Sequence, residues 1–411
     1  MCAASATARS SSTGGSPTAC LRCSNWESSV ARGNPRHPQW RRLDVRDARR
    51  TESFGVVVVG GGQAGLAMGY HLQRLGLEFV ILDAAARVGQ SWREHWDSLR
   101  LFTPARYDCL PGMPFPAAAN SFPTKDEMAD YLEEYARRFA LPVRSQTRAN
   151  RVARDGDRYL VECGDAIFRT TEVVIATGAH AIASIPGLAA EVDTEVLQLH
   201  AQDYRNPAQL RPGPVLVVGA GNSGAEIAME AAAAGHETWL AGRTVGHIPS
   251  RAYAFGGRIF WLIANHVVSR RHPLGRRLLA KMASRGGPLI RLTIDDVTAS
   301  RVQLASRVEG VSQGRPRLAD GRVVAANSIV WCTGFSQDFS WIDAGLVEAP
   351  GFHLVGMPFQ YKLASAFVGG VGSDAGRIAR RISAARKRRG RANHLPALSS
   401  SHEKVTPGKA L

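Results

Sequence analysis

Residues 56–83, VVVVGGGQAGLAMGYHLQRLGLEFVILD, are the feature that most constrains how this chain can fold. Four valines predict a short buried strand, and three glycines follow it at the spacing G-x-G-x-x-G. We expect a helix over residues 64–75 that ends at Gly76, and then a second strand over residues 79–82. This order of elements predicts a βαβ unit of the type that binds dinucleotides.

Each residue of the motif has a separate expected role. Gly60 permits a tight turn, Gly62 lets the backbone approach a pyrophosphate, and Gly65 lets the helix pack closely on the strand. Asp83 lies 23 residues after Gly60, where an acid accepts hydrogen bonds from ribose hydroxyls. An ordinary βαβ unit without a ligand is the alternative, and the combination of strand, turn, helix and acid disfavours it.

The same pattern returns later in the chain. Strands are predicted over residues 215–218 and 238–241 around a helix over residues 225–234, and the turn holds Gly219, Gly221 and Gly224. The position that matches Asp83 is Gly242, and Arg243 follows it. An acid repels a ribose 2′-phosphate, whereas an arginine binds one. The first site therefore suits FAD or NAD, and the second suits NADP.

Similar sequence follows both units. Residues 151–176 predict a β-meander and a buried strand that ends at Thr177. Residues 302–311 and 317–324, with a turn at Asp320, predict a second meander, and the strand over residues 328–332 again ends in Thr-Gly. We therefore expect the fold class α/β, with two Rossmann-like dinucleotide-binding domains that each carry a β-meander.

The FAD-binding domain is expected to be discontinuous, with the NADPH-binding domain inserted into it. The expected parts are a disordered or mis-assigned extension (1–52), the first part of the FAD domain (53–211), the NADPH domain (212–325), the FAD return segment (326–384) and a basic disordered tail (385–411). Within the return segment, FVGGVGSDAGRIARRI predicts a strand, a glycine-rich turn and a helix, with Asp374 near the helix start.

Composition excludes several other classes of protein. The two ends of the chain carry most of the formal net charge of +16, so the folded body is nearly neutral and we do not expect nucleic-acid binding. The uncharged run at residues 54–73 holds too many glycines and polar residues for a transmembrane helix. Six scattered cysteines give no disulfide framework, which suits a reducing, cytoplasmic location. No metal site is expected, and the oligomeric state is open, with a homodimer among the options.

The chain resembles the class B flavin-dependent monooxygenases over residues 54–382. The resemblance rests on GGGQAG with Asp83, VGQSWREHWDSLRLFTPARYDCLPG, VIATG, QLHAQDYRNPAQL, VLVVGAGNSG, IVWCTGF and GGVGSDA. It implies FAD on the first unit, in contact with Gly60, Gly62, Gly65, Asp83, Gly89, Ser91, Trp92, Thr177 and Asp374. It implies NADPH on the second unit, in contact with Gly219, Gly221, Asn222, Ser223, Gly224 and Arg243, and with His200 and Tyr204 of the family's linker signature.

The resemblance also implies a reaction. NADPH reduces FAD, O2 then forms a flavin peroxide, and one oxygen atom is inserted into a small organic substrate of unidentified structure, as in N,N-dimethylaniline monooxygenases. No side chain stands out as an acid, base or nucleophile, so the catalytic residues are unknown. The alternatives are a non-catalytic or transport-associated flavoprotein and a general NAD(P)H-flavin oxidoreductase. A disulfide reductase is the least favoured alternative, because the sequence offers no redox cysteine pair that would face the flavin.

The chain departs from the family pattern in the linker and in the return segment. Thr194 and Val196 occupy linker positions where the family has an aromatic residue and a glycine, and Gln90 replaces a second glycine. Residues 342–358 form a shorter stretch than the family leads us to expect. A histidine that only stabilises the linker by hydrogen bonds is the other interpretation of His200.

Overall fold

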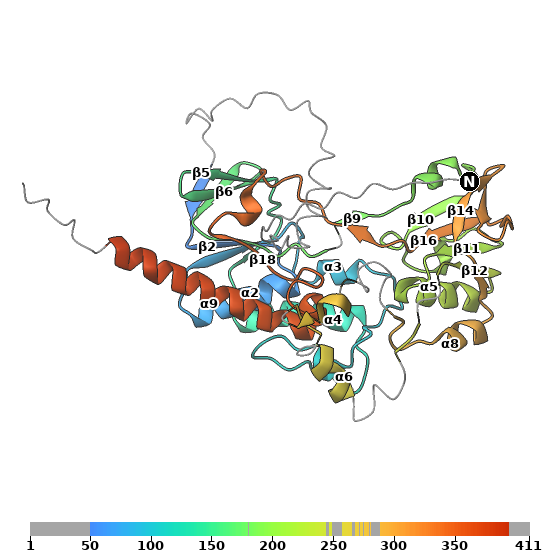
Figure 1. Ribbon diagram of the computed structural model, residues 1–411, viewed down its shortest axis with the longest axis horizontal. Coiled ribbons are helices and arrows are strands. Elements are labelled where there is room, and N and C mark those ends of the chain that lie inside the picture. The colour runs from blue at the N-terminus through green and yellow to red at the C-terminus, as the bar shows by residue number, and fades with distance from the viewer. Residues whose placement is uncertain are drawn as a thin grey trace, which may run out of the picture. The chain divides into compact units, whose positions relative to one another are not determined.

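The computed structural model describes residues 50–393, except 180, 244–245, 249–256, 265–267, 271, 274, 279 and 281–287. The predicted extension before residue 50 and the tail after residue 393 lie outside the described residues. The described part is a mixed α/β fold with two five-stranded parallel sheets (Figure 1). The predicted fold class is therefore confirmed.

The first sheet has the strand order β18-β8-β2-β3-β4. Its strands are β2 (Val56–Val59), β3 (Phe79–Leu82), β4 (Val143–Arg144), β8 (Val173–Ile175) and β18 (Phe352–Leu354). Helix α2 (Gln63–Arg74) connects β2 to β3, and Gly76 follows it in the left-handed region with φ +64°. All four valines of the central strand β2 are buried, because neighbouring strands and helices leave neither face to water.

The second sheet has the order β10-β16-β11-β12-β13. Its strands are β10 (Leu197–His200), β11 (Val215–Val218), β12 (Thr238–Ala241), β13 (Gln303–Ala305) and β16 (Ser328–Trp331), and α5 (Asn222–Ala233) connects β11 to β12. The expected domain boundaries at 212 and 326 do not match this sheet, since β10 precedes the first and β16 follows the second. The physical reason is that β16 pairs with both β10 and β11, a long-range contact that sequence spacing does not show.

The first meander is confirmed and extended by one strand. It consists of β5 (Arg151–Asp155), β6 (Arg158–Cys163) and β7 (Ala166–Thr170), and β1 (Arg50–Ser53) pairs in parallel with β7. The expected extension of 1–52 is therefore too long, because the fold already includes residues 50–52. The second meander is confirmed only in part, because residues 303–305 form β13 of the second parallel sheet. The rest is a hairpin of β14 (Val308–Ser312) and β15 (Arg315–Leu318), and a bridge between Arg317 and Val323 closes the predicted turn at Asp320.

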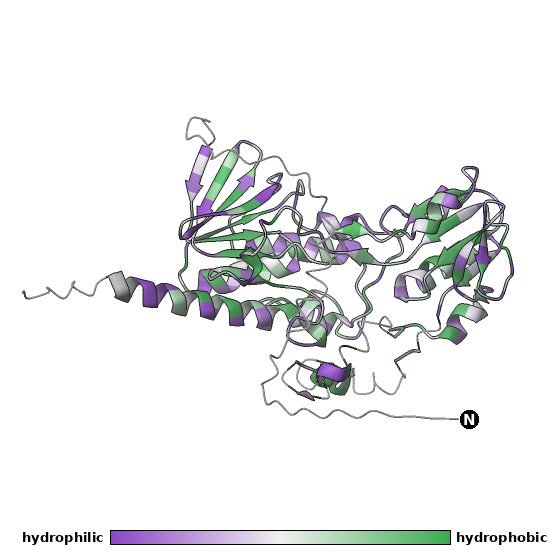
Figure 2. Ribbon diagram, turned by 45° about the horizontal axis from the view of Figure 1, so that its top comes forward, coloured by the Kyte–Doolittle hydropathy of each residue, from purple (hydrophilic) through white to green (hydrophobic). Residues whose placement is uncertain are grey.

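Helix α9 (Val368–Asn393) corrects two expectations about the return segment. The predicted strand and turn at residues 367–372 are wrong, because the glycines belong to the first turns of this helix. A Cβ on Gly369 would lie 1.9 Å from the carbonyl oxygen of Tyr107, and one on Gly370 would lie 1.8 Å from that of Ala364, so these glycines permit close packing. The expected disordered tail from 385 is wrong as far as residue 393. Hydrophobic and hydrophilic bands alternate along α9 (Figure 2).

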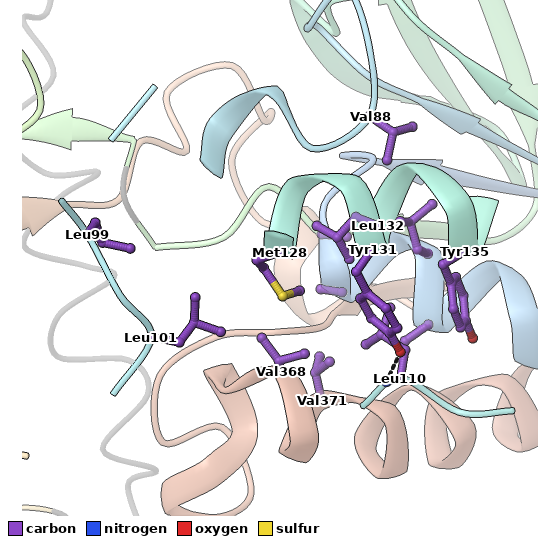
Figure 3. Close-up of a cluster of buried hydrophobic side chains, with 14 of the residues drawn as sticks. Val88, Leu99, Leu101, Leu110, Met128, Tyr131, Leu132, Tyr135, Val368 and Val371 are labelled. Atoms are coloured by element: carbon purple, nitrogen blue, oxygen red, sulfur yellow. Dashed lines mark hydrogen bonds between the residues drawn. The ribbon is translucent and has the colours of Figure 1, made fainter. Parts of the chain in front are cut away.

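Helix α4 (Lys125–Arg138) shares a buried cluster with the start of α9, to which it contributes Met128 and Tyr131 and α9 contributes Val368 and Val371 (Figure 3). A capping box begins this helix: the Thr124 hydroxyl accepts a hydrogen bond from Glu127 N at 3.1 Å, and Thr124 N donates to the Glu127 carboxylate at 2.7 Å. Tyr131 is buried in the core, where its hydroxyl accepts from Leu110 N at 2.7 Å and donates to Met113 O at 2.8 Å.

The remaining elements are short and lie in the connections. They are α3 (Gln90–Arg93), α6 (Arg258–Leu262), α8 (Ile294–Ala299), the antiparallel pair β9 (Ile182–Ala183) and β17 (Phe335–Ser336), and the 3-10 turns Ala105–Tyr107, Gly187–Glu191, Pro207–Gln209, Leu346–Glu348 and Leu363–Ala366. None of the described helices combines the length and the apolar composition that a membrane span requires.

Candidate dinucleotide sites

The three glycines of the first loop have different surroundings. Gly60 has φ +108°, and a Cβ there would lie 2.6 Å from the carbonyl oxygen of Ala176. A Cβ on Gly65 would lie only 1.8 Å from the carbonyl oxygen of Gly60. Around Gly62, the N-cap of α2, a Cβ would meet nothing within 4 Å. The fold therefore needs Gly60 and Gly65, whereas Gly62 leaves open space at a helix N-terminus, where an anion binds favourably.

Asp83 closes the first site at the end of β3. Its Oδ2 accepts a hydrogen bond from Gly61 N at 2.7 Å, and its Oδ1 accepts one from Ala85 N at 2.8 Å. Two backbone donors thus fix the carboxylate against the glycine loop. Each carboxylate oxygen can accept a further bond, so the geometry suits recognition of ribose hydroxyls.

The second loop repeats this arrangement. A Cβ on Gly219, where φ is +112°, would lie 2.2 Å from the carbonyl oxygen of Cys332, and one on Gly224 would lie 1.8 Å from that of Gly219. Gly221, the N-cap of α5, again has nothing within 4 Å of a Cβ. The two loops therefore share one division of roles, two glycines for packing and one that faces open space.

The loops differ at the position that tells one dinucleotide from another. The first has Gly61 beneath the carboxylate of Asp83, whereas the second has Ala220 beneath Gly242. A Cβ on Gly242 would lie 2.9 Å from the Cβ of Ala220 and 2.7 Å from its backbone nitrogen. The second site thus has no room for an acid at this position, and Arg243 is exposed directly after it.

The predicted FAD residues outside the loop come from three segments. Gly89, with φ +81°, is the N-cap of α3, Ser91 is exposed and Trp92 is partly buried. Thr177 is exposed just after β8, and its backbone nitrogen would lie 3.0 Å from a Cβ on Gly60. The structure thus brings Thr177 to the first loop.

Asp374 is the strongest sign of a bound group at the first site. It is 0 % exposed, and neither carboxylate oxygen has a hydrogen-bond partner among the described residues. Burial raises the pKa of this carboxyl. The Ser365 and Ser373 hydroxyls and the Lys362 charge oppose this rise, but no described donor lies within hydrogen-bond distance of the buried carboxyl. The position therefore fits a hydroxyl-bearing cofactor such as FAD.

Among the predicted NADPH residues, Asn222 holds a neighbouring loop. Its amide donates to Pro288 O at 3.3 Å and accepts from Ile290 N at 2.8 Å, at the N-terminus of α5. Ser223 is partly buried beside it. The sequence offered no signal for the role of the 288–290 loop, because the contact joins residues more than sixty positions apart.

The linker residues His200 and Tyr204 make contacts within the protein. His200 Nδ1 accepts from Gln202 N at 3.1 Å, so Nε2 carries the proton and donates to Gly334 O at 3.0 Å. Burial lowers the pKa of His200, which favours the neutral ring. The Tyr204 hydroxyl donates to Glu230 of α5 at 3.0 Å. Contact of either residue with NADPH stays a prediction.

The departures from the family pattern are accommodated. Val196 is 4 % exposed in the core of the second sheet, and Thr194 is exposed. Residues 342–358 include β18, which pairs with β8, so this shorter stretch still supplies a return strand to the first sheet.

A small pocket lies where α6, α9 and the segment after α3 meet. It measures about 120 Å³ and is lined by Arg106, Tyr107, Cys109, Trp261 and Gly369. The rings of Tyr107 and Trp261 are 5.2 Å apart. Ligand sites are usually larger, roughly 300 Å³ or more, so this pocket would enclose only part of a substrate.

Asp108, which the sequence analysis did not single out, is a buried carboxyl whose ionisation should make the stability of the protein depend on pH. It is 0 % exposed, burial raises its pKa to about 7, and the Thr103 hydroxyl donates to its Oδ1. Between its ordinary pKa and this raised one, the folded state keeps a proton that the unfolded state has lost, so stability falls as pH rises.

We expect the free energy of unfolding to drop by about 2–3 kcal/mol between about pH 5 and about pH 8 through Asp108. In Asp108→Asn this part of the slope should be absent, since the amide does not ionise. Urea unfolding of both proteins across this range measures it. Equal slopes for the two proteins would contradict the assignment.

Three comparisons with known proteins bear on this site. A family model described as pyridine nucleotide-disulphide oxidoreductase matches residues 57–251. An uncharacterised CzcO-like oxidoreductase of Geobacillus kaustophilus is 35 % identical over 344 residues, which are 78 % of this chain and 95 % of the relative. A flavin-containing monooxygenase structure from Stenotrophomonas maltophilia has 28 % identity and a TM-score of 0.67, and the match covers 82 % of this chain and 99 % of that one.

A further relative is a probable indole-3-pyruvate monooxygenase, YUCCA9, of Arabidopsis thaliana. It is 27 % identical over 329 residues, which are 70 % of this chain and 76 % of the relative. These similarities identify the chain as a flavin-dependent oxidoreductase that binds FAD and NADPH. The chain belongs to the class B flavin-dependent monooxygenase family.

The described cysteines do not support disulfide reduction, despite the description of the matching family model. Cys109, Cys163 and Cys332 are all free. Burial raises the pKa of Cys163 to about 11 and that of Cys332 to about 12. Thiols with such raised pKa values are poor nucleophiles at neutral pH.

Proposed function

We propose that this protein is an NADPH-dependent, FAD-containing monooxygenase that inserts one oxygen atom from O2 into a small organic substrate. Bound FAD would accept a hydride from NADPH and then react with O2 to supply the oxygen atom. The observation that carries the proposal is the difference between the two glycine loops. The first places the Asp83 carboxylate over Gly61, whereas the second has Gly242 packed against Ala220 and therefore no acid.

The chain's own share of the work is to bind, orient and enclose the cofactors. Gly62 and Asp83 would hold the pyrophosphate and ribose of FAD, and Asp374 would accept from one of its hydroxyls. Gly221 and Arg243 would hold the pyrophosphate and 2′-phosphate of NADPH. His200, neutral and anchored to the end of β16, would keep the linker in place rather than transfer a proton.

For the substrate, we propose a small aromatic molecule that places its ring near Tyr107 and Trp261 in the small pocket. Arg106, which is exposed and lines the same pocket, would favour an acidic substituent. A relative named as an indole-3-pyruvate monooxygenase supports a test of aromatic 2-oxo acids. N,N-dimethylaniline and a cyclic ketone represent the other reaction types of flavin monooxygenases.

The experiment measures NADPH consumption, hydrogen peroxide and product mass for each of these compounds under air. A monooxygenase adds the mass of one oxygen atom to one of them, with NADPH consumed in proportion. NADPH consumption that yields only peroxide, with every compound, would favour a general NAD(P)H-flavin oxidoreductase. A protein whose bound FAD is not reduced by NADPH would favour the non-catalytic flavoprotein.

Arg243→Ala should weaken the binding of NADPH more than the binding of NADH. We expect the rate at which dilute NADPH bleaches the flavin to fall about tenfold or more, since a charge-assisted contact to the 2′-phosphate contributes about 1.5–3 kcal/mol. The rate with NADH should change less than about twofold. Stopped-flow absorbance with both nucleotides measures the ratio. If both rates fall equally, Arg243 does not recognise the 2′-phosphate.

A further inference from the structure

Helix α9 has two faces of different character. Its inner face includes Ile378, Ala379 and Ile382, which are buried in the core that α9 shares with α2. Asp374, near the start of the helix, is the only acid in α9, and many of the later residues are arginine or lysine. Because the inner face is packed in the core, the helix has a fixed orientation and presents its other face to solvent.

Exposed cations occupy the solvent face of α9, namely Arg380, Arg381, Lys387 and Arg388. Arg380 and Lys387 are seven positions apart, and so are Arg381 and Arg388, so both pairs lie on the same side of the helix, two turns apart. Ala384 is exposed between the pairs and adds no charge. These cations form no ion pair with an acid in the part of the chain that the structure describes. We refer to Arg380, Arg381, Lys387 and Arg388 as the cationic face.

Two other arginines of α9 contact the folded body and hold this part of the helix in place. Arg389 Nη1 lies 3.0 Å from Oε1 of Glu172, and His353 Nε2 lies 2.8 Å from the other oxygen of this carboxylate. The Glu172 side chain is only 1 % exposed. Arg386 packs against Gly55, just before β2. These contacts fix the last turns of α9 beside the first sheet, so the cationic face remains in solvent.

The composition of the cationic face indicates which kind of partner it fits. Like charges gathered on one surface without acids repel one another, and a negatively charged partner relieves this repulsion. The exposed residues of the face include no aromatic, amide or hydroxyl side chain, which are the groups that contact bases and sugars in nucleic acids. They also include no large apolar side chain to form the centre of a protein–protein interface. Attraction to a bilayer of anionic lipids needs only clustered cations near its surface.

We propose that the cationic face of α9 binds the anionic headgroups of a phospholipid bilayer. The protein then lies on the membrane surface and is held there by charge, because the apolar face of α9 is packed in the core and does not insert. Binding of this kind is reversible and weakens with salt, since the Debye length falls to about 3 Å at about 1 M. The inference goes beyond the proposed function, because it does not involve the dinucleotide sites.

The test is sedimentation of the full-length protein with vesicles of mixed phosphatidylglycerol and phosphatidylcholine. Replacement of all four cations of the face by glutamine should weaken binding about 100-fold or more, because each contributes about fivefold near an anionic surface. Vesicles of phosphatidylcholine alone should not bind the wild type. A control variant removes the same net charge from exposed residues around the second sheet and should bind within about threefold of the wild type. Its substitutions are Arg211→Gln, Arg307→Gln, Arg317→Gln and Arg322→Gln.

Salt-sensitive binding that is lost in the α9 variant and kept in the control variant supports the proposal. A wild type that does not bind the mixed vesicles overturns it, and so does an α9 variant that binds as the wild type does. An equal loss in the control variant also overturns it, because net charge rather than the cationic face is then responsible. A DNA duplex that binds more tightly than the vesicles, and is released by the same substitutions, assigns the face to nucleic acid instead.

Smaller variants keep the test decisive if the fourfold variant does not fold, which urea unfolding shows. Arg380→Gln with Arg381→Gln, and Lys387→Gln with Arg388→Gln, should each weaken vesicle binding about tenfold or more. Arg380→Lys with Arg381→Lys keeps the charge and should bind as the wild type does. Equal loss in the lysine and glutamine variants of this pair overturns the proposal, because the shape of arginine rather than charge is then required.

Discussion

Gly62→Ala is expected to fold normally and to lose FAD. Gly62 has φ −75°, which alanine adopts freely, and its Cβ would meet nothing within 4 Å. The free energy of unfolding of the apoprotein should therefore change by less than about 1 kcal/mol. The added methyl group would occupy the space that the pyrophosphate needs, so FAD affinity should fall about 100-fold or more, about 2.8 kcal/mol.

Gly65→Ala is the matched comparison in the same loop. Its Cβ would lie 1.8 Å from the carbonyl oxygen of Gly60, so helix α2 must move away from β2. We expect the apoprotein to lose about 3 kcal/mol of stability. Urea unfolding of the apoproteins and fluorescence titration with FAD separate the two effects. FAD binding by Gly62→Ala with the affinity of the wild type would contradict the assignment of this loop.

Gly221→Ala should weaken the binding of NADP⁺ and leave the binding of FAD unchanged. Gly221 has φ −82° and open space around a Cβ, so the variant should fold and keep its flavin. We expect NADP⁺ to bind about 100-fold more weakly, because the pyrophosphate must approach the backbone of this loop. Titration calorimetry of the flavin-loaded protein with NADP⁺ measures the change.

The comparison for the second loop is Gly224→Ala. Its Cβ would lie 1.8 Å from the carbonyl oxygen of Gly219, so this variant should be destabilised by about 3 kcal/mol. If Gly221→Ala releases FAD and leaves NADP⁺ binding intact, the two loops have been assigned to the wrong cofactors. If neither ligand is affected, the loop does not bind a dinucleotide.

The proposed reaction needs both loops in one protein, because electrons pass from one bound cofactor to the other. Linker contacts tie the parts of the chain together. Tyr204 bonds to α5, and the backbone nitrogen of Asp97 donates to Arg205 O at 2.7 Å. His200 and Tyr204 therefore stabilise the linker through contacts within the protein.

Local elements were predictable from the sequence because their signals are short-range. The strand at residues 56–59, the helix that follows and the capping box at Thr124 depend on residues within a few positions of one another. The repeated G-x-G-x-x-G spacing likewise specified two dinucleotide units. The glycines at the start of α9 were predicted wrongly from the pattern alone. The pattern predicted a turn, whereas in the structure these glycines let the helix pack closely against neighbouring backbone.

The sequence alone thus determined the class of fold, the two glycine loops and the acid or arginine that distinguishes them. Only the tertiary structure decided which strands share a sheet, since β16 pairs with β10 and β11 from more than one hundred positions away. It alone placed Ala220 beneath Gly242 and buried Asp108. These features depend on packing between segments that are distant in the sequence. A local sequence pattern does not show which side chains such packing buries.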